Sequence, residues 1–155
     1  IAKSLAWSLG IELVGISSLE VLALNGRYFN GYVCPLFDAR RGQLYTALFK
    51  AENGEVTRVQ DDPNLLAKDF VEGLKELNEP VLFVGSDALI HEETFKEALG
   101  ERAVLAPASL HHARPGELAM LGMQRDAEEI HSFVPNYVRL AEAEAKWLEA
   151  QEREE

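Results

Sequence analysis

The sequence predicts an α/β protein in which a three-stranded antiparallel meander is followed by alternating helices and strands. Turn signals at 38–42 and 52–54 separate three strand-like segments. Beyond residue 61 the apolar residues recur with a helical period, which two short apolar runs interrupt. With 155 residues, of which 47% are apolar and 26% charged, the chain is long enough to bury one ordinary core.

The first residues start inside a helical pattern. Ile1, Leu5 and Leu9 share one face of a helix, and Gly10 is suited to end it. A short strand over 12–15 and a second helix over 18–24 are expected to follow.

These elements cannot form an independent sheet. We therefore predict that residues 1–25 are the C-terminal remnant of a first lobe, and that residues 26–155 form a second lobe with a C-terminal helix. The alternative is that residues 1–25 pack on the main domain as an extra layer.

The predicted meander has its strands at 32–38, 43–50 and 55–60. The first of them is nearly continuously apolar, which is expected of a strand covered on both faces. Pro35 conflicts with a central position because proline cannot donate a hydrogen bond to its neighbour. A bulge or an unpaired edge is therefore expected there.

The rest of the chain alternates helices with strands. Helices are expected at 62–77, 92–99 and 115–125, and strands at 81–84 and 103–105, before a short strand at 137–139 and a charged helix at 141–153. This is the element order of the ribonuclease H-like fold, which actin-like ATPases duplicate in two lobes. We predict one such lobe, with a mixed sheet and flanking helices.

Composition excludes several classes of function. A net charge of −11 disfavours a general nucleic-acid binder, although residues 1–50 carry five basic and only three acidic side chains. A single cysteine excludes an internal disulfide and a cysteine-based zinc cluster. No apolar run approaches the ~20 residues of a membrane span. With no signal-peptide pattern, a cytoplasmic location is expected.

Three stretches of the sequence occur in a distinctive order and spacing. They are AKSLAW at 2–7 with GI and VGISSLE at 10–20, PLFDARRGQLY at 35–45, and PNYVR at 135–139 with AE at 143–144. They resemble the AKGLAW…GI.LVGVSSLE, DARRGEVY and P.YLR…AE signatures of the bacterial TsaB (YeaZ) family. The resemblance runs through essentially the whole chain, but the Gly-rich GPGSFTG.R segment that precedes the first stretch in that family is absent.

The resemblance implies a non-catalytic subunit of the machinery that attaches threonylcarbamoyl to adenosine 37 of tRNA. In that family the subunit pairs with the catalytic TsaD subunit, and the TsaE ATPase joins them. The implied protein has no cofactor and no metal-binding histidines, and it meets tRNA only indirectly. Its fold is that of the actin-like ATPases, and first-lobe helices form its interface with TsaD.

The hairpin at 38–42 is the first candidate site. In actin-like folds the first hairpin of a lobe approaches phosphates, and Arg40 and Arg41 could bind a phosphate or a partner's carboxylates. Gly42 would allow close approach of a backbone. We expect Asp38, Arg40, Arg41, Gly42 and Tyr45 to face a cleft or a partner. The alternative is a solvated turn in which Asp38 bonds its own backbone.

The second candidate site is the apolar face of the first helix. Ile1, Ser4, Leu5, Trp7 and Ser8 are expected to form an interface, because an apolar face without its own domain recruits partners. The isolated chain is accordingly expected to form a homodimer through this helix. The alternative is that Trp7 belongs to the core.

Enzyme functions are the alternative to these interfaces. A nuclease of this fold would use Asp38, Glu72 or Glu76, and Asp87 to hold two metals. The helical phase of 100° per residue places both glutamates opposite the apolar face, away from the sheet.

Nothing in the sequence supports a nucleophile with its base. Cys34 lies in an apolar strand and is expected to be buried and inert. The four histidines, His91, His111, His112 and His131, are expected at the surface or in loops. No G-x-S-x-G elbow occurs. A peptidase-like or nucleotide-hydrolysing actin-fold enzyme stays open as the alternative function, as does an interaction module with an unrelated partner.

Overall fold

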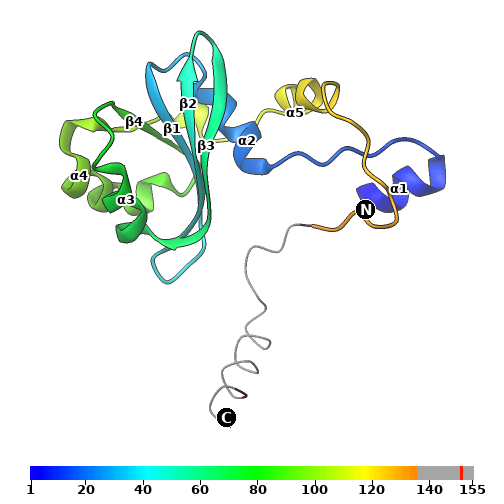
Figure 1. Cartoon of the computed structure of the whole chain (residues 1–155), viewed down its shortest axis with the longest axis horizontal. Helices are drawn as coiled ribbons and strands as arrows, with labels where there is room; N and C mark the ends of the chain where they lie inside the picture. Colours follow the sequence, from blue (N-terminus) through cyan, green and yellow to red (C-terminus); the bar gives the residue numbers. More distant parts are fainter. Residues whose placement is uncertain (136–150, 152–155) are drawn as a thin grey trace.

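A five-stranded mixed sheet organises the chain, and the computed structural model describes residues 1–135 and 151. The strand order is β3-β2-β1-β4-β5 (Figure 1). The strands are β1 (Gly31–Asp38), β2 (Gln43–Glu52), β3 (Glu55–Leu66), β4 (Val81–Val84) and β5 (Ala103–Leu105). β1, β2 and β3 form the antiparallel meander, whereas β4 and β5 run parallel to β1. The predicted mixed α/β sheet with a meander and flanking helices is confirmed.

Helices cover the sheet on both faces. α3 (Ala67–Leu74) and α4 (Glu92–Leu99) pack over the face that carries Cys34 and Leu36. α2 (Ser18–Ala23) packs over the opposite face, which carries Val33 and Phe49. α5 (Pro115–Gly122) contacts α2. The two cores follow from the alternation of side chains along a strand, which turns Val33 to one face and Cys34 to the other.

Short 3₁₀ helices link these elements. They are η1 (Leu24–Gly26), η2 (Ala88–His91), η3 (Gly100–Arg102) and η4 (Ala108–Leu110). Because β4 and η2 are joined only by residues 85–87, η2 begins directly at the end of the sheet to which β1 and β4 point their carboxyl ends.

The predicted bounds of helices and strands are right where the local sequence pattern is strong, and wrong where pairing between strands determines where an element ends. The strands at 81–84 and 103–105 and the helix at 92–99 are confirmed to the residue. α3 starts at residue 67 instead of 62, because β3 continues to pair with β2 up to Leu66↔Gln43. The stretch 12–15 is not a strand, and α5 ends three residues early. The elements expected at 137–139 and 141–153 lie outside the described residues.

Pro35 occupies a central strand without the expected bulge or free edge. The pairing of β1 with β2 keeps one register from Val33↔Phe49 to Leu36↔Thr46. The Thr46 hydroxyl donates to the Pro35 carbonyl oxygen at 2.9 Å. The hydroxyl thus supplies a donor to the Pro35 carbonyl oxygen, although Pro35 itself has no N–H to donate. Because the register is unbroken and β1 lies between β2 and β4, the expectation of a bulge or an edge is wrong.

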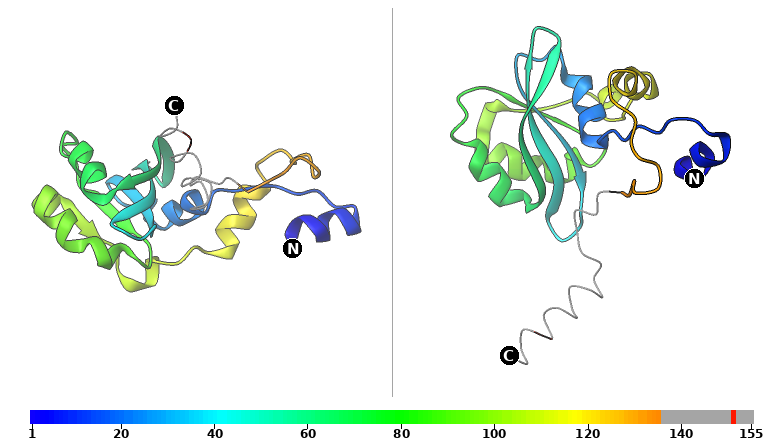
Figure 2. Two further views of the ribbon diagram at one scale, coloured as in Figure 1. Left: turned by 90° about the horizontal axis from the view of Figure 1, so that it is seen from below. Right: turned by 45° about the vertical axis from the view of Figure 1, so that its right-hand side comes forward.

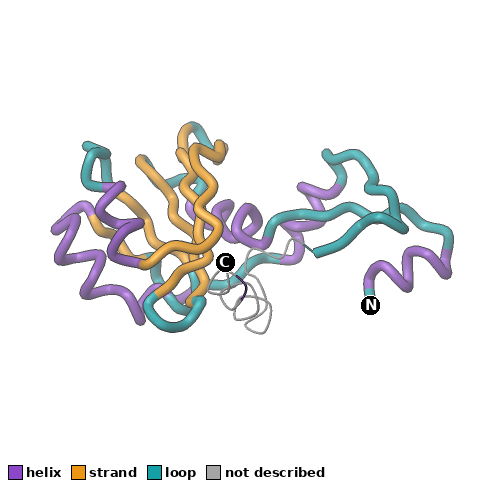
Figure 3. Tube along the Cα trace, turned by 60° about the horizontal axis from the view of Figure 1, so that its bottom comes forward, coloured by secondary structure: helices purple, strands orange, loops and turns teal. Residues whose placement is uncertain are grey.

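A projecting arm extends away from the sheet. We call residues 1–17 and 123–135 the arm (Figures 1 and 2). It begins with α1 (Ala2–Leu9), which Gly10 ends at φ 63°. The tube in Figure 3 shows the two halves of the arm side by side, and the Glu128 N–H donates to the Leu13 carbonyl oxygen at 2.8 Å. No described helix is long and apolar enough to cross a membrane.

The division of the chain at residue 25 stays a prediction. Leu22 and Ala23 of α2 share a core with the sheet, whereas the arm projects from it. The segment 1–25 therefore contains two parts with different surroundings.

Gly85 connects β4 to the candidate site, and an alanine there should destabilise the fold. Its φ is 144°, and a Cβ would collide with the Leu36 carbonyl oxygen. We expect Gly85→Ala to lower the free energy of unfolding by about 2–5 kcal/mol, measured by urea denaturation.

The matched control is Gly73→Ala in α3, where nothing lies within 4 Å of the added Cβ. A helical alanine there should raise stability by up to about 1 kcal/mol. Equal effects of the two substitutions would show that the close approach of Leu36 does not require a glycine at residue 85.

Candidate functional site

The β1–β2 hairpin has an unusual backbone. Arg40 and Arg41 both lie in the left-handed region, at φ 65° and 55°, and Gly42 follows at φ 75°. For a residue with a Cβ this conformation costs roughly 1–2 kcal/mol. Two successive arginines therefore need contacts that hold the turn in place.

Those contacts come from the turn itself and from α3. The Ala39 N–H donates to the Gln43 carbonyl oxygen at 2.9 Å, and the Gln43 N–H donates to the Arg40 carbonyl oxygen at 3.0 Å. The Ala67 N–H at the start of α3 donates to the Gly42 carbonyl oxygen at 2.8 Å. The hairpin is thus tied to the body of the protein.

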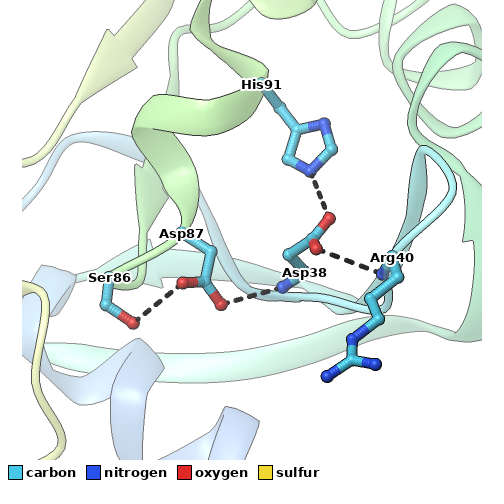
Figure 4. Close-up of polar contacts among 5 residues, drawn as sticks. All are labelled: Asp38, Arg40, Ser86, Asp87 and His91. Atoms are coloured by element: carbon cyan, nitrogen blue, oxygen red, sulfur yellow. Dashed lines mark hydrogen bonds and ion pairs between the residues drawn. The ribbon is translucent and has the colours of Figure 1, made fainter.

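Asp38 lies at the centre of a polar cluster behind the hairpin (Figure 4). Its Oδ2 accepts a hydrogen bond from the Arg40 N–H at 3.1 Å, which is the backbone contact that the solvated-turn alternative expects. Its Oδ1 accepts from His91 Nε2 at 3.0 Å. Its own N–H donates to Asp87 Oδ2 at 3.0 Å. Both carboxylate oxygens are therefore engaged.

The position of His91 corrects the sequence-based expectation of a surface or loop residue. His91 ends η2 and is only 7% exposed. The parallel pairing of β1 with β4 brings Asp38 and Asp87 to one edge, and His91 follows Asp87 by four residues, about one helical turn. The spacing of four residues between Asp87 and His91 is the one sequence feature that points to this contact. It predicts the contact only if the segment after β4 is known to be helical.

His111 is also buried, again contrary to expectation. It is 8% exposed, and its Nδ1 accepts a hydrogen bond from the Gly85 N–H at 3.2 Å. His112 and His131 are exposed, as predicted. No local pattern separates the two adjacent histidines, because the burial of His111 depends on the approach of a distant loop to β4.

The carboxylates that a nuclease would need do not meet. Asp38 and Asp87 come together, whereas Glu72 lies on the exposed face of α3 and pairs with Lys75 at 2.7 Å. Glu76 is exposed as well. Within residues 1–135 and 151, no group of three histidine, cysteine or acidic side chains is arranged to hold a metal ion. The helical phase predicted from the sequence is thus confirmed.

Two further residues of the predicted sites lie along the meander. Tyr45 is half-buried on β2, opposite Phe37 of β1. Cys34 is fully buried, with its Sγ at 3.1 Å from Thr46 Oγ1. The expectation of a buried thiol is confirmed.

The candidate interface on α1 is exposed. Trp7 is 67% exposed and Leu5 54%, so the alternative of Trp7 as a core residue is wrong. Ser4 and Ser8 are exposed too, and Ile1 is fully so.

The other half of the arm holds α1 in place. Lys3 Nζ donates to the carbonyl oxygens of His131 and Phe133 at 2.8 and 2.9 Å. Trp7 and His131 make an edge-on ring contact at 6.3 Å between centroids. A hollow of about 190 Å³ lies between the two halves, lined by Lys3, Ser4, Trp7, Ile130 and His131.

Comparisons with known proteins place these features in a family. A family model described as "TsaD: tRNA N6-adenosine threonylcarbamoyltransferase" matches residues 1–147. A Bacillus subtilis (strain 168) protein named "tRNA threonylcarbamoyladenosine biosynthesis protein TsaB" is 49% identical over 151 residues. That match covers 97% of this chain and 66% of the relative, so the chain spans just under two thirds of its length.

Two solved structures from Pseudomonas aeruginosa share the fold. One, described as an uncharacterised protein with similarity to peptidase YEAZ, has a TM-score of 0.66 at 18% identity over 88% of this chain and 63% of its own. The other, YeaZ, has a TM-score of 0.65 at 19% identity over 88% and 64%. At such identities the likeness shows the fold alone.

Glu129 should make the arm sensitive to acid. Hydrogen bonds from the His131 N–H, and then from Ser132, lower the pKa of Glu129 to about 2 from 4.5. Because the folded pKa is depressed, the ionised carboxylate stabilises this turn above about pH 4.5, and the contribution is lost as the pH falls towards 2. Glu129→Gln should therefore speed amide hydrogen exchange at His131 and Ser132 near neutral pH, measured by NMR.

The effect of Glu129→Gln should disappear near pH 2. The control is Glu128→Gln, a neighbour whose side chain does not cap these amides. Equal protection of both amides in the Glu129 variant and the unsubstituted chain at neutral pH would contradict the assignment.

Proposed function

Since this chain belongs to the TsaB (YeaZ) family, we propose that it is a non-catalytic scaffold subunit for threonylcarbamoyl transfer to adenosine 37 of tRNA. It acts through complexes with a TsaD-like catalytic subunit and a TsaE-like ATPase. The observation that carries the proposal is the 49% identity to B. subtilis TsaB across 97% of the chain.

Two surfaces are the proposed contacts with partners. The first is the arm, on which Ile1, Leu5 and Trp7 expose apolar area next to exposed serines. The second is the hairpin with Arg40 and Arg41. The apolar surface of the arm suits an apolar partner surface, whereas the basic hairpin suits an acidic one. The two surfaces are therefore proposed to bind two different partners.

We also propose that the chain divides into parts of two lobes. Residues 1–25 are assigned to the end of a first lobe, and residues 26–155 to the second. A first lobe would cover part of the apolar arm, which gives a physical reason for its exposure here.

A scaffold role agrees better with the polar clusters than an enzyme does. Both carboxylate oxygens of Asp38, at the base of the hairpin, are engaged, one by His91 and one by the Arg40 N–H. In the described part of the chain, no serine hydrogen bonds to a histidine, as a peptidase-like nucleophile would require. Contact with tRNA is proposed to be indirect, because the chain carries a net charge of −11.

Reconstitution tests the proposed function. Purified chain, TsaD-like subunit, TsaE-like ATPase and tRNA are combined with the reaction's substrates, and threonylcarbamoyladenosine is measured by mass spectrometry. Omission of the chain should abolish product. Full product without the chain would contradict the scaffold role, and product from the chain without the TsaD-like subunit would favour the enzyme alternative.

Reversing the charge of the hairpin should weaken a partner contact. We expect Arg40→Glu with Arg41→Glu to reduce affinity for the TsaD-like or the TsaE-like subunit by at least about tenfold, since each exposed pair contributes on the order of 1 kcal/mol. The measurement is isothermal titration calorimetry. The control is Lys68→Glu on α3 with Lys75→Glu directly after it, and unchanged binding by the hairpin variant to both subunits would rule the hairpin out.

The exposed face of α1 should make the isolated chain dimerise. We expect light scattering to give the mass of a dimer, and Leu5→Glu with Trp7→Glu to give a monomer, because charges would replace exposed apolar side chains. Leu89→Glu with Ile90→Glu is the control, since both residues are exposed on η2. A monomeric unsubstituted chain at high concentration would contradict this expectation.

A further inference from the structure

The buried histidine behind the hairpin, His91, does not itself lie on either of the two surfaces proposed above as partner contacts. His91 reaches Asp38 from η2, and its ring lies 6.1 Å from that of Phe95 in the core. A polar ring buried next to an aromatic core is retained where it makes a specific hydrogen bond. Here the bond goes to the carboxylate that accepts from the Arg40 N–H in the arginine hairpin.

The two carboxylate oxygens of Asp38 accept hydrogen bonds from different donors. Oδ2 accepts from the Arg40 N–H, and Oδ1 accepts from His91 Nε2. The Asp38 backbone is held separately, by Asp87. His91 is thus the side chain that fixes the rotation of the carboxylate about its own bond, with Oδ2 over the hairpin backbone (Figure 4).

The hairpin depends on that orientation. The Asp38 carboxylate meets the backbone at the point where the chain enters the left-handed conformation of Arg40 and Arg41. Aspartate stabilises such turns through this local hydrogen bond. Without this hydrogen bond, only the remaining backbone contacts of the turn would oppose the strain at Arg40 and Arg41.

We propose that His91 is a positioning residue which, through Asp38, holds Arg40 and Arg41 in the geometry that binds carboxylates of an acidic protein partner. This inference rests on the proposed function, because it concerns how the same hairpin recognises its partner.

The chemistry of the turn favours carboxylates over a phosphate. Phosphate sites on turns use backbone N–H groups as well as side chains. In this turn the carboxylate of Asp38 already accepts from the Arg40 N–H, so this backbone donor is not available to a phosphate. The guanidinium of Arg40 extends away from the cluster (Figure 4), so a partner group that binds it lies on the side away from the Asp38 carboxylate. Forked binding of protein carboxylates by guanidinium groups needs no backbone donor.

The test uses the full chain with purified B. subtilis TsaD as the probe. His91→Ala should weaken binding at least tenfold, and NMR couplings and shifts should show that Arg40 and Arg41 leave the left-handed region. His91→Gln, which can still donate to Asp38, should bind within threefold of the unsubstituted chain. His112→Ala, an exposed histidine, is the control and should change neither readout.

A double-mutant cycle separates positioning from general stability. In the background of Arg40→Glu with Arg41→Glu, His91→Ala should cause no further loss of binding, because the arginines through which it acts are gone. An additional tenfold loss there, or a failure of His91→Gln to restore binding, would show a merely structural role and overturn the inference. Circular dichroism checks that each variant is folded, and the milder His91→Gln keeps the test decisive if His91→Ala does not fold.

The remaining outcomes distinguish the two proposals. Normal binding by the charge-reversed hairpin, or no binding by the unsubstituted chain, overturns the hairpin as a TsaD contact and this inference with it. Loss of binding in the charge-reversed hairpin together with normal binding and an intact left-handed turn in His91→Ala overturns this inference alone. If the charge-reversed hairpin loses affinity for tRNA but not for TsaD, the partner is a nucleic acid and the acidic protein partner is excluded.

Discussion

The pairing of β1 with two different neighbours is the constraint on which the rest of the structure depends. On one side β1 continues the antiparallel meander, and on the other it runs parallel to β4. The parallel pair forces the residues after both strands to meet at one edge of the sheet, so that Asp38 contacts Asp87 and reaches His91. The antiparallel pair places the arginine turn at that same edge. The candidate site thus follows from the topology of one strand.

Much of the fold could be predicted because its signals are local. Two short apolar runs and a glycine after residue 99 defined the bounds of β4, β5 and α4. The start of α3 was missed because residues up to Leu66 gain more from pairing with β2 than from an earlier helix. Local propensity gave way to tertiary contacts in that segment.

The candidate site could be predicted only in part, for a similar reason. The turn and its arginines are visible in the sequence, and the proximity of Asp38 to Asp87 follows from the order of the strands. The burial of His91 and His111 does not, because each is covered by segments distant in the sequence. Single histidines carry no periodic signal, so their hydrogen-bond partners emerge only with the packed sheet.

The hydrogen bonds between Lys3 and the second half of the arm affect the order in which the chain can fold during synthesis. Lys3 bonds to carbonyl oxygens that lie 128 and 130 positions later in the sequence. On the ribosome, helix α1 therefore emerges long before the segment on which it docks, whereas the meander can pair as soon as residue 66 is available. The strands of the meander can therefore pair before the carbonyl oxygens that bind Lys3 have been synthesised.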